Sequence, residues 1–229
     1  MKILFLCQYF PPEMGAPSAR TYEHAKYWVQ LGHEVTIVCG LPNHPDGIVP
    51  LEYRGKIVVR ENWDGIRVLR GWLYATPNRG VVKRSIAFLT YMLSSIFVAI
   101  FFAGKCDVVV ATSPQILCGL AGYIVSIFKW RPFVLEVRDL WPAQIIDLGV
   151  IKNRFLISIL SHLETFLYRH AKAIVTIAPA MSQEIIQCGF DSDKIFTIPN
   201  GVEETFFKPI DGGVRIRQEK NWDDSKIIV

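Results

Sequence analysis

Short runs of apolar and β-branched residues alternate along the chain with longer stretches whose apolar positions recur every three or four residues. The short runs predict strands buried on both faces of a sheet, and they cover 2–9, 34–39, 57–59, 67–69, 107–111, 133–137, 173–177 and 194–198. The longer stretches predict helices over 19–31, 82–103, 115–128, 155–170 and 181–188. This alternation predicts an α/β fold with a doubly wound, mostly parallel sheet.

The pattern changes after Phe207. Residues 208–229 begin KPIDGG, continue with charged residues that suit one short helix, and end in KIIV, which reads as the start of another strand. We therefore expect residues 1–207 to form one domain. Residues 208–229 then form an interdomain linker and the start of a truncated carboxyl-terminal domain.

The second predicted helix is unusually apolar. Residues 85–103 include 19 positions without a charge, flanked by Lys83, Arg84 and Lys105, and about 20 such residues span a bilayer. The strands on either side are expected in one sheet, which argues against a span. Two readings stay open: a buried core helix, and a helix with one apolar edge in the lipid interface.

The positive charge of the chain is concentrated in one segment. The 229 residues are 51% hydrophobic and 20% charged with a net charge of +4, yet eight Arg or Lys lie between Arg54 and Arg84 against Glu61 and Asp64. Such a segment is either a solvated basic edge or a surface for phosphates or anionic lipid, so 54–103 is our candidate membrane-facing segment. The modest charge and the lack of a recognisable module disfavour nucleic-acid binding.

Several classes of chemistry are disfavoured by missing motifs. The five cysteines show no CxxC spacing, which is typical of reduced core thiols in a cytosolic protein, and no zinc spacing, HExxH or P-loop occurs. The first strand is followed by Gly15 alone where a dinucleotide fold would place GxGxxG. We therefore expect no metal and no cofactor, and neither a dehydrogenase nor a nucleotide-sugar epimerase.

Candidate chemistry lies where the strand at 133–137 ends. The segment FVLEVRDLWP places Arg138, Asp139 and Trp141 beyond its carboxyl end, where ligands bind in wound sheets. The alternative is that Asp139 caps a turn and Trp141 packs under a loop. Glu136, inside the apolar strand, needs a partner, either Arg138 or a backbone amine.

Ser113 follows the predicted strand at 107–111, so it is a further candidate for lining this crevice. The sequence Ser113-Pro114 favours instead an ordinary helix start, with the serine as cap and the proline at the first position. His24 and His44 have no evident partner and are expected to lie on the surface or in loops.

Four segments taken in order resemble the amino-terminal domain of a family 4 glycosyltransferase of the GT-B architecture. They are KILFLCQYFPPEMGAPSAR, LGHEVTIVCGLPNHPDG, EVRDLWP, and IVTIAPAMSQEIIQCGF followed by IFTIPNGVEETFFKP. The resemblance covers essentially the whole chain. It looks nearest to the WbuB-like sugar transferases of bacterial surface polysaccharide synthesis.

The resemblance implies roles for particular residues. Gly15 and Ala16 match the small-residue pair that lies near the donor phosphates in this family. The substrate-binding candidates are these two residues, Arg20 in the same motif, Ser113 and Trp141. Many relatives carry a histidine where this chain has Arg138 and Asp139, which we take as the catalytic candidates. Asp139 would orient the acceptor hydroxyl or stabilise sugar charge, Arg138 would neutralise phosphate or hold Asp139, and Trp141 would stack on a sugar.

The resemblance also implies an activity. A retaining hexosyl- or N-acetylaminosugar transferase would move a sugar from a nucleotide-sugar donor, a co-substrate, to a lipid-linked saccharide or another oligosaccharide acceptor. The protein would lie in the cytoplasm on the inner face of the plasma membrane. The family's Glu-x7-Glu site belongs to the other domain, so we expect this fragment alone to be inactive; the alternative is a non-catalytic sugar- or lipid-binding module.

Overall fold

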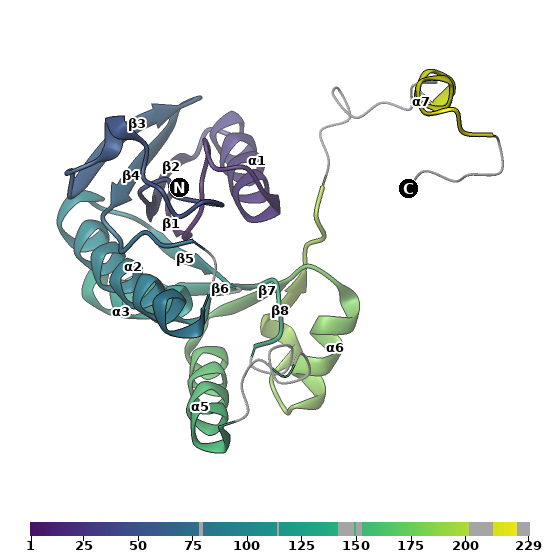
Figure 1. The fold of residues 1–229 in the computed structure, drawn as a ribbon. Coiled ribbons are helices and arrows are strands. Elements are labelled where there is room, and N and C mark those ends of the chain that lie inside the picture. The colour runs from purple at the N-terminus through teal and green to yellow at the C-terminus, as the bar shows by residue number, and fades with distance from the viewer. Residues whose placement is uncertain (78–79, 114, 142–148, 150–152, 202–212, 224–229) are drawn as a thin grey trace. The chain divides into compact units, whose positions relative to one another are not determined.

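The structure is a computed structural model that describes residues 1–77, 80–113, 115–141, 149, 153–201 and 213–223 (Figure 1). The chain divides into two compact units, Met1–Pro199 and Asn200–Val229. In the second unit the described helix α7 spans Gly213–Lys220, where a short helix was expected. The predicted domain boundary at 207 falls within 202–212, outside the described residues.

The first unit is built on one eight-stranded sheet with the order β3-β4-β2-β1-β5-β6-β7-β8. Every neighbouring pair is parallel except β3 and β4. This confirms the predicted α/β, mostly parallel, doubly wound sheet. The strands are β1 Lys2–Leu6, β2 Glu34–Gly40, β3 Val58–Trp63, β4 Ile66–Gly71, β5 Val108–Thr112, β6 Phe133–Val137, β7 Ala173–Thr176 and β8 Ile195–Thr197.

Strands β3 and β4 form an antiparallel hairpin at one edge of the sheet. The sequence pattern predicted two separate strands of three residues here, and that prediction was too short. The turn between them is Asp64-Gly65, and both residues have positive φ (49° and 84°). Two such residues make the tight turn whose twist matches paired strands, so the Asp-Gly pair was the sequence signal for the hairpin.

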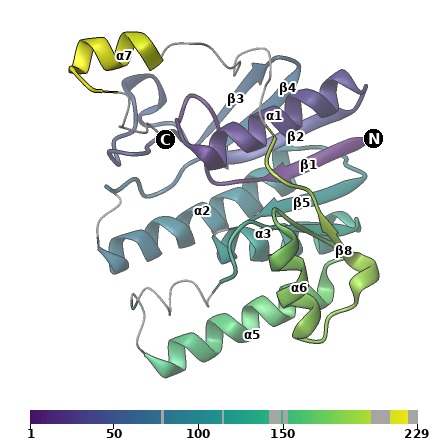
Figure 2. The same cartoon turned by 90° about the vertical axis from the view of Figure 1, so that its right-hand side faces the viewer.

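Among the described residues of this unit, five α-helices cover the sheet unequally (Figure 2). Helix α1 (Ala16–Gln30) packs on one face, in a core cluster with Phe5, Ile37 and Val68. A second cluster, around Leu4, Leu6 and other strand residues, joins the opposite face to the remaining helices. These are α2 Val81–Phe102, α3 Ile116–Lys129, α5 Arg154–His170 and α6 Pro179–Gln187. Short 3₁₀ turns span Leu51–Tyr53 and Ser192–Lys194.

Two boundaries near the end of β1 differ from expectation. The strand ends at Leu6, so 7–9 lie beyond it, and α1 begins at Ala16 instead of residue 19. Gly15 precedes the helix with φ 145°, a conformation that favours glycine, and Pro17 occupies the first turn, where its missing N–H costs little. The loop between β1 and α1 therefore keeps its predicted length but begins and ends three residues earlier.

Candidate functional site

The alternation of side chains along β6 sends the two candidate catalytic residues to opposite sides of the sheet. Glu136 and Arg138 lie on the face covered by α1, while Val137 packs into the core beneath α3 and α5. Asp139 lies on the same side as Val137, where it lines a small hollow with Glu164 and Tyr168 of α5. Adjacent residues thus serve two different surfaces.

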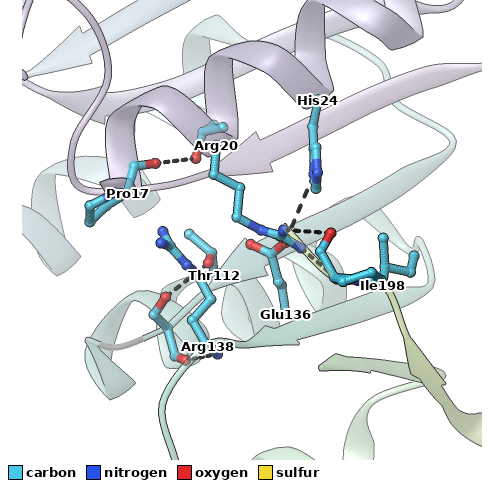
Figure 3. Close-up of polar contacts among 10 residues, drawn as sticks. Pro17, Arg20, His24, Thr112, Glu136, Arg138 and Ile198 are labelled. Atoms are coloured by element: carbon cyan, nitrogen blue, oxygen red, sulfur yellow. Dashed lines mark hydrogen bonds and ion pairs between the residues drawn. The ribbon is translucent and has the colours of Figure 1, made fainter. Parts of the chain in front are cut away.

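Glu136 forms a buried ion pair with Arg20 of α1, as Figure 3 shows. Arg20 Nε and Nη2 each lie 2.9 Å from Glu136 Oε1, and both side chains are at most 6% exposed. Arg20 also donates to the backbone carbonyls of Ile198 (3.1 Å) and Pro199 (3.3 Å). The prediction that Arg138 or a backbone amine would pair with Glu136 was wrong, because Arg20 reaches the carboxylate from the helix above it.

His24 lies one helical turn after Arg20 and completes this cluster. Its Nδ1 is 4.0 Å from Glu136 Oε1, and its ring is 5.9 Å from that of Trp28. Burial and the neighbouring Arg20 lower the pKa of His24, which keeps the imidazole neutral at pH 7. The expectation that His24 has no partner was also wrong.

Ser113 holds the start of the segment that carries the candidate residues. Its Oγ accepts a hydrogen bond from the backbone N–H of Arg138 (2.8 Å), and its own N–H donates to the carbonyl of Glu136 (2.8 Å). Helix α3 begins at Ile116 after Gln115, without a side-chain cap, so the predicted cap at Ser113 was wrong. Pro114 lies outside the described residues.

A pocket of about 280 Å³ opens where β1 meets its two neighbouring strands. We call it the switch-point pocket, because α1 leaves this point on one face of the sheet and α3 on the other. Its walls come from the segment after β1, from the first turns of α1 and α2, and from the segments after β5 and β6. Its lining includes Gln8, Tyr9, Arg84, Gln115, Arg138 and Trp141.

Loop contacts fix one wall of the switch-point pocket. The Glu13 carboxylate accepts the backbone N–H groups of Asn43 (2.9 Å) and His44 (3.0 Å), and the His44 ring meets Tyr9 edge-on at 5.2 Å. His44 lines the pocket, so its interpretation as a residue without a partner was wrong. Burial raises the pKa of Glu13 despite these bonds.

The thiols in the switch-point pocket are not nucleophiles at neutral pH. Cys7 and Cys118 line it, and burial raises the pKa of both, that of Cys118 to about 12. Burial likewise raises the pKa of Tyr9 to about 12. Among the described residues no group of three or more His, Cys, Asp or Glu could hold a metal ion.

The predicted site residues are brought together only in part. Arg138, Ser113 and Trp141 line the switch-point pocket, and Trp141 also packs against the core beneath α3 and α5, so both of its predicted surroundings occur together. Gly15 and Ala16 are exposed and adjoin the pocket through the next residue, Pro17.

Asp139 lies against a second hollow of only about 20 Å³, which shares Ser113, Gln115 and Trp141 with the pocket. No hydrogen bond or ion pair joins Arg138 to Asp139 within the described part of the chain, although the charge of Asp139 favours the charged form of Arg138, so the role of Arg138 in holding Asp139 stays a prediction.

Glu164, on the wall of that second hollow, should make stability depend on pH. Burial raises its pKa from 4.5 to about 7, although Tyr168 donates a hydrogen bond to it (2.8 Å). Between these values the folded carboxyl keeps a proton that the unfolded chain releases, so stability falls as pH rises through this window. Because the side chain is partly exposed, we expect a loss of about 1–2 kcal/mol between pH 5 and 8.

Glu164→Gln should abolish most of this dependence, whereas Glu23→Gln on the exposed surface of α1 should leave it intact. Urea denaturation at a series of pH values measures both. Equal slopes for Glu164→Gln and the unaltered chain would contradict the assignment.

Sequence reasoning missed the residues that come from distant segments, chiefly Arg84, Gln8, Tyr9 and Gln115. Arg84 was counted in the basic segment but given no place, because only the packing of α2 brings it to the same pocket as Arg138. Gln115 had a usable signal, since it lies between the carboxyl end of β5 and the start of α3.

The doubly wound sheet, with its pocket at the carboxyl ends of the central strands, has the Rossmann-like fold of one half of a GT-B glycosyltransferase. The family model of the glycosyl transferase 4-like domain matches residues 15–201, and the chain therefore belongs to that family. None of the curated protein sequences compared with the chain matches it.

Solved structures share this fold at low sequence identity. HepE of Anabaena in complex with UDP-glucose matches with a TM-score of 0.56 at 17% identity, covering 96% of this chain and 50% of HepE. HepE with UDP and glucose matches with a TM-score of 0.55 at 18% identity and the same coverage. The chain thus spans about half the length of the protein that it matches.

Proposed function

We propose that this chain is the acceptor-binding half of a retaining glycosyltransferase, which transfers a hexose or N-acetylamino sugar from a nucleotide-sugar donor to a lipid-linked saccharide. Family membership supports sugar transfer, and HepE, with the same fold, is solved with UDP-glucose. The WbuB-like motifs support a role in bacterial surface polysaccharide synthesis. On this proposal the protein works in the cytoplasm, against the inner face of the plasma membrane.

The exposed face of α2 carries the lipid-linked part of this proposal. One stripe of its apolar side chains, spaced by three or four residues, is 44–72% exposed, and it consists of Val82, Ile86, Leu89, Leu93, Phe97 and Phe101. We call this set the α2 stripe. A surface of contiguous large apolar side chains on one helix is typical of contact with a membrane or a partner.

Positive charge lies at both ends of the α2 stripe. Lys83 and Arg84 are in the first turn of α2, and Lys105 follows the helix. At the end of the adjacent α3, Lys129 donates to the carbonyl of Gly104 (2.7 Å), which places its charge beside the end of α2. An apolar stripe with cations at its ends suits an anionic lipid surface.

The face of α2 opposite the α2 stripe supports a helix that lies in the lipid interface and does not cross the membrane. Within the described residues, α2 is the helix long and apolar enough to cross a membrane. However, Tyr91, Ser95, Val98 and Ala99 are buried beneath it, and the strands before and after it belong to one sheet. The expectation of a fully buried core helix does not hold for the α2 stripe, which leaves contact at the lipid interface as the supported alternative.

Flotation with anionic vesicles tests the membrane contact. We expect the chain to float with vesicles of phosphatidylglycerol and phosphatidylcholine at low salt, and Phe101→Asp to reduce the bound fraction about tenfold or more, because it removes a buried apolar side chain from lipid and adds a negative charge. Tyr27→Asp, an exposed aromatic on α1, is the matched control and should float normally. Equal behaviour of the two variants would contradict the proposal.

Transfer itself is tested with the full-length product of the gene. A radiolabelled nucleotide sugar is supplied with either a polyprenyl-diphosphate-linked sugar or the same saccharide free in solution. Faster transfer to the lipid-linked acceptor, with the anomeric configuration of the donor kept in the product as seen by NMR, is the expected result. Vesicle and sugar binding without transfer would favour the non-catalytic binding module instead.

A further inference from the structure

Two arginines line the switch-point pocket with hydrogen-bonding nitrogens that no described residue engages. Arg138 is 9% exposed, yet its Nε and Nη1 have no hydrogen-bond partner in the described part of the chain. The same holds for Nε of Arg84. Figure 3 shows the Arg138 side chain leaving the end of β6 toward Pro17 at the start of α1, and both residues line this pocket. A buried guanidinium without partners is costly unless a ligand supplies them.

The surroundings of these arginines favour an anion. No Asp or Glu is among the described residues that line the pocket. The nearby Glu136 is already paired with Arg20. Pro17 in the first turn of α1 and Gln115 at the start of α3 lie in its wall, so the positive ends of two long helix dipoles are directed to it.

Gln115 also has an amide nitrogen and oxygen without partners, and it is 6% exposed. This buried amide therefore adds donor and acceptor capacity to the same pocket.

Arg84 lies in the first turn of the helix that carries the α2 stripe. Its guanidinium lies 5.7 Å from the ring centre of Phe88, and both residues line the pocket on the side of α2 turned away from the stripe, because residues two positions apart on a helix face different ways. Val81 and Val82 in the same turn are exposed, so the path from the pocket to the stripe runs around the start of the helix. A ligand that matches both features has a strongly anionic head and a hydrocarbon chain attached to it.

We propose that Arg84 and Arg138 form a binding site for the diphosphate of a prenyl-diphosphate-linked acceptor, whose hydrocarbon chain follows the α2 stripe. Planar guanidinium groups bind phosphate oxygens in pairs, and two of them match the two phosphates of such a group. This inference rests on the proposed function and names the residues that recognise the acceptor. It makes Arg84 a specificity-determining residue and gives Arg138 a phosphate partner on the acceptor side.

The test is calorimetric titration of the chain with farnesyl diphosphate, a short prenyl diphosphate. We expect binding that Arg84→Gln weakens about tenfold to a hundredfold, as the loss of hydrogen bonds to a charged group predicts. Arg169→Gln removes the same charge from an exposed arginine in the last turn of α5, which does not line the pocket, and should change the affinity less than about threefold. Arg84→Lys, which keeps the charge without the planar fork, should fall between them.

Three further probes separate the sources of the phosphate. Farnesol tests the hydrocarbon alone, inorganic pyrophosphate tests the anion alone, and UDP tests the nucleotide donor. Each is expected to bind about tenfold or more weaker than farnesyl diphosphate, because each lacks one of the two contacts. Phosphorus NMR of bound farnesyl diphosphate should show both resonances perturbed, and circular dichroism confirms that each variant is folded.

Equal losses for Arg84→Gln and Arg169→Gln would overturn the proposal, because the effect would then be general surface charge. Binding of UDP or pyrophosphate as tight as that of farnesyl diphosphate would also overturn it. Such a failure would leave transfer to a lipid-linked acceptor by the full-length protein unaffected. Failure of the proposed function would instead appear as absent transfer while the Arg84 site still binds.

Discussion

Asp139→Asn should lower kcat of the full-length enzyme about 100- to 1000-fold, the usual loss when one charge-stabilising group is removed from an active site. We assign Asp139 to orienting the acceptor hydroxyl or stabilising positive charge on the sugar. Asparagine has nearly the same shape, so the change removes the charge of Asp139 and leaves the shape of the small hollow that it lines nearly unaltered. Steady-state kinetics with saturating donor and acceptor measure the effect.

The control for Asp139→Asn is Asp193→Asn, which changes an exposed residue before β8 and should leave kcat unaltered. The competing interpretation of Asp139 as a turn cap makes the opposite prediction: lower stability with an unchanged kcat. Urea denaturation of both variants distinguishes these outcomes. An unchanged kcat would show that Asp139 is not catalytic, and Arg138 would stay as the catalytic candidate.

Arg20→Met should destabilise the chain by about 3–5 kcal/mol, because it leaves the buried carboxylate of Glu136 without its cation. The carboxylate is 6% exposed, and its Oε2 already has no hydrogen-bond partner in the described part of the chain. The change also frees the carbonyls of Ile198 and Pro199. Urea denaturation at pH 7 measures the loss.

The double variant Arg20→Met/Glu136→Leu tests the physical cause. Replacing both members of a buried pair by apolar residues is often close to neutral, so most of the stability should return. A double variant as unstable as the sum of its single changes would show that the buried charge is not responsible. Arg20 is then a positioning residue for the end of β6, while its predicted contact with substrate stays a prediction.

The order of strands and helices could be predicted from the sequence, because buried parallel strands are nearly continuous in apolar residues and helices between them are not. Leu4 and Val109, for example, lie in such runs. The hairpin was missed because β3 alternates exposed and half-buried residues, which gives no apolar run. Its Asp64-Gly65 turn was the stronger signal.

The position of the candidate site could be predicted, but its internal contacts could not. Carboxyl ends of parallel strands meet at one edge, so Arg138 and Ser113 were expected together. Which cation pairs with Glu136 depends on the rotation of α1, and which basic residue reaches the pocket depends on where α2 begins. Both are set by packing between distant segments; Arg20 and Glu136, for example, are 116 residues apart in the sequence.

The two edge strands of the sheet limit strand pairing between one copy of the protein and another. An open sheet edge offers backbone groups that can pair with a second chain and start fibre-like aggregation. Here one edge is β3, which carries Arg60 and Glu61, and the other is β8, which has only three residues. Although α2 exposes apolar side chains, the two strand edges of this sheet thus offer a second chain little opportunity for backbone pairing.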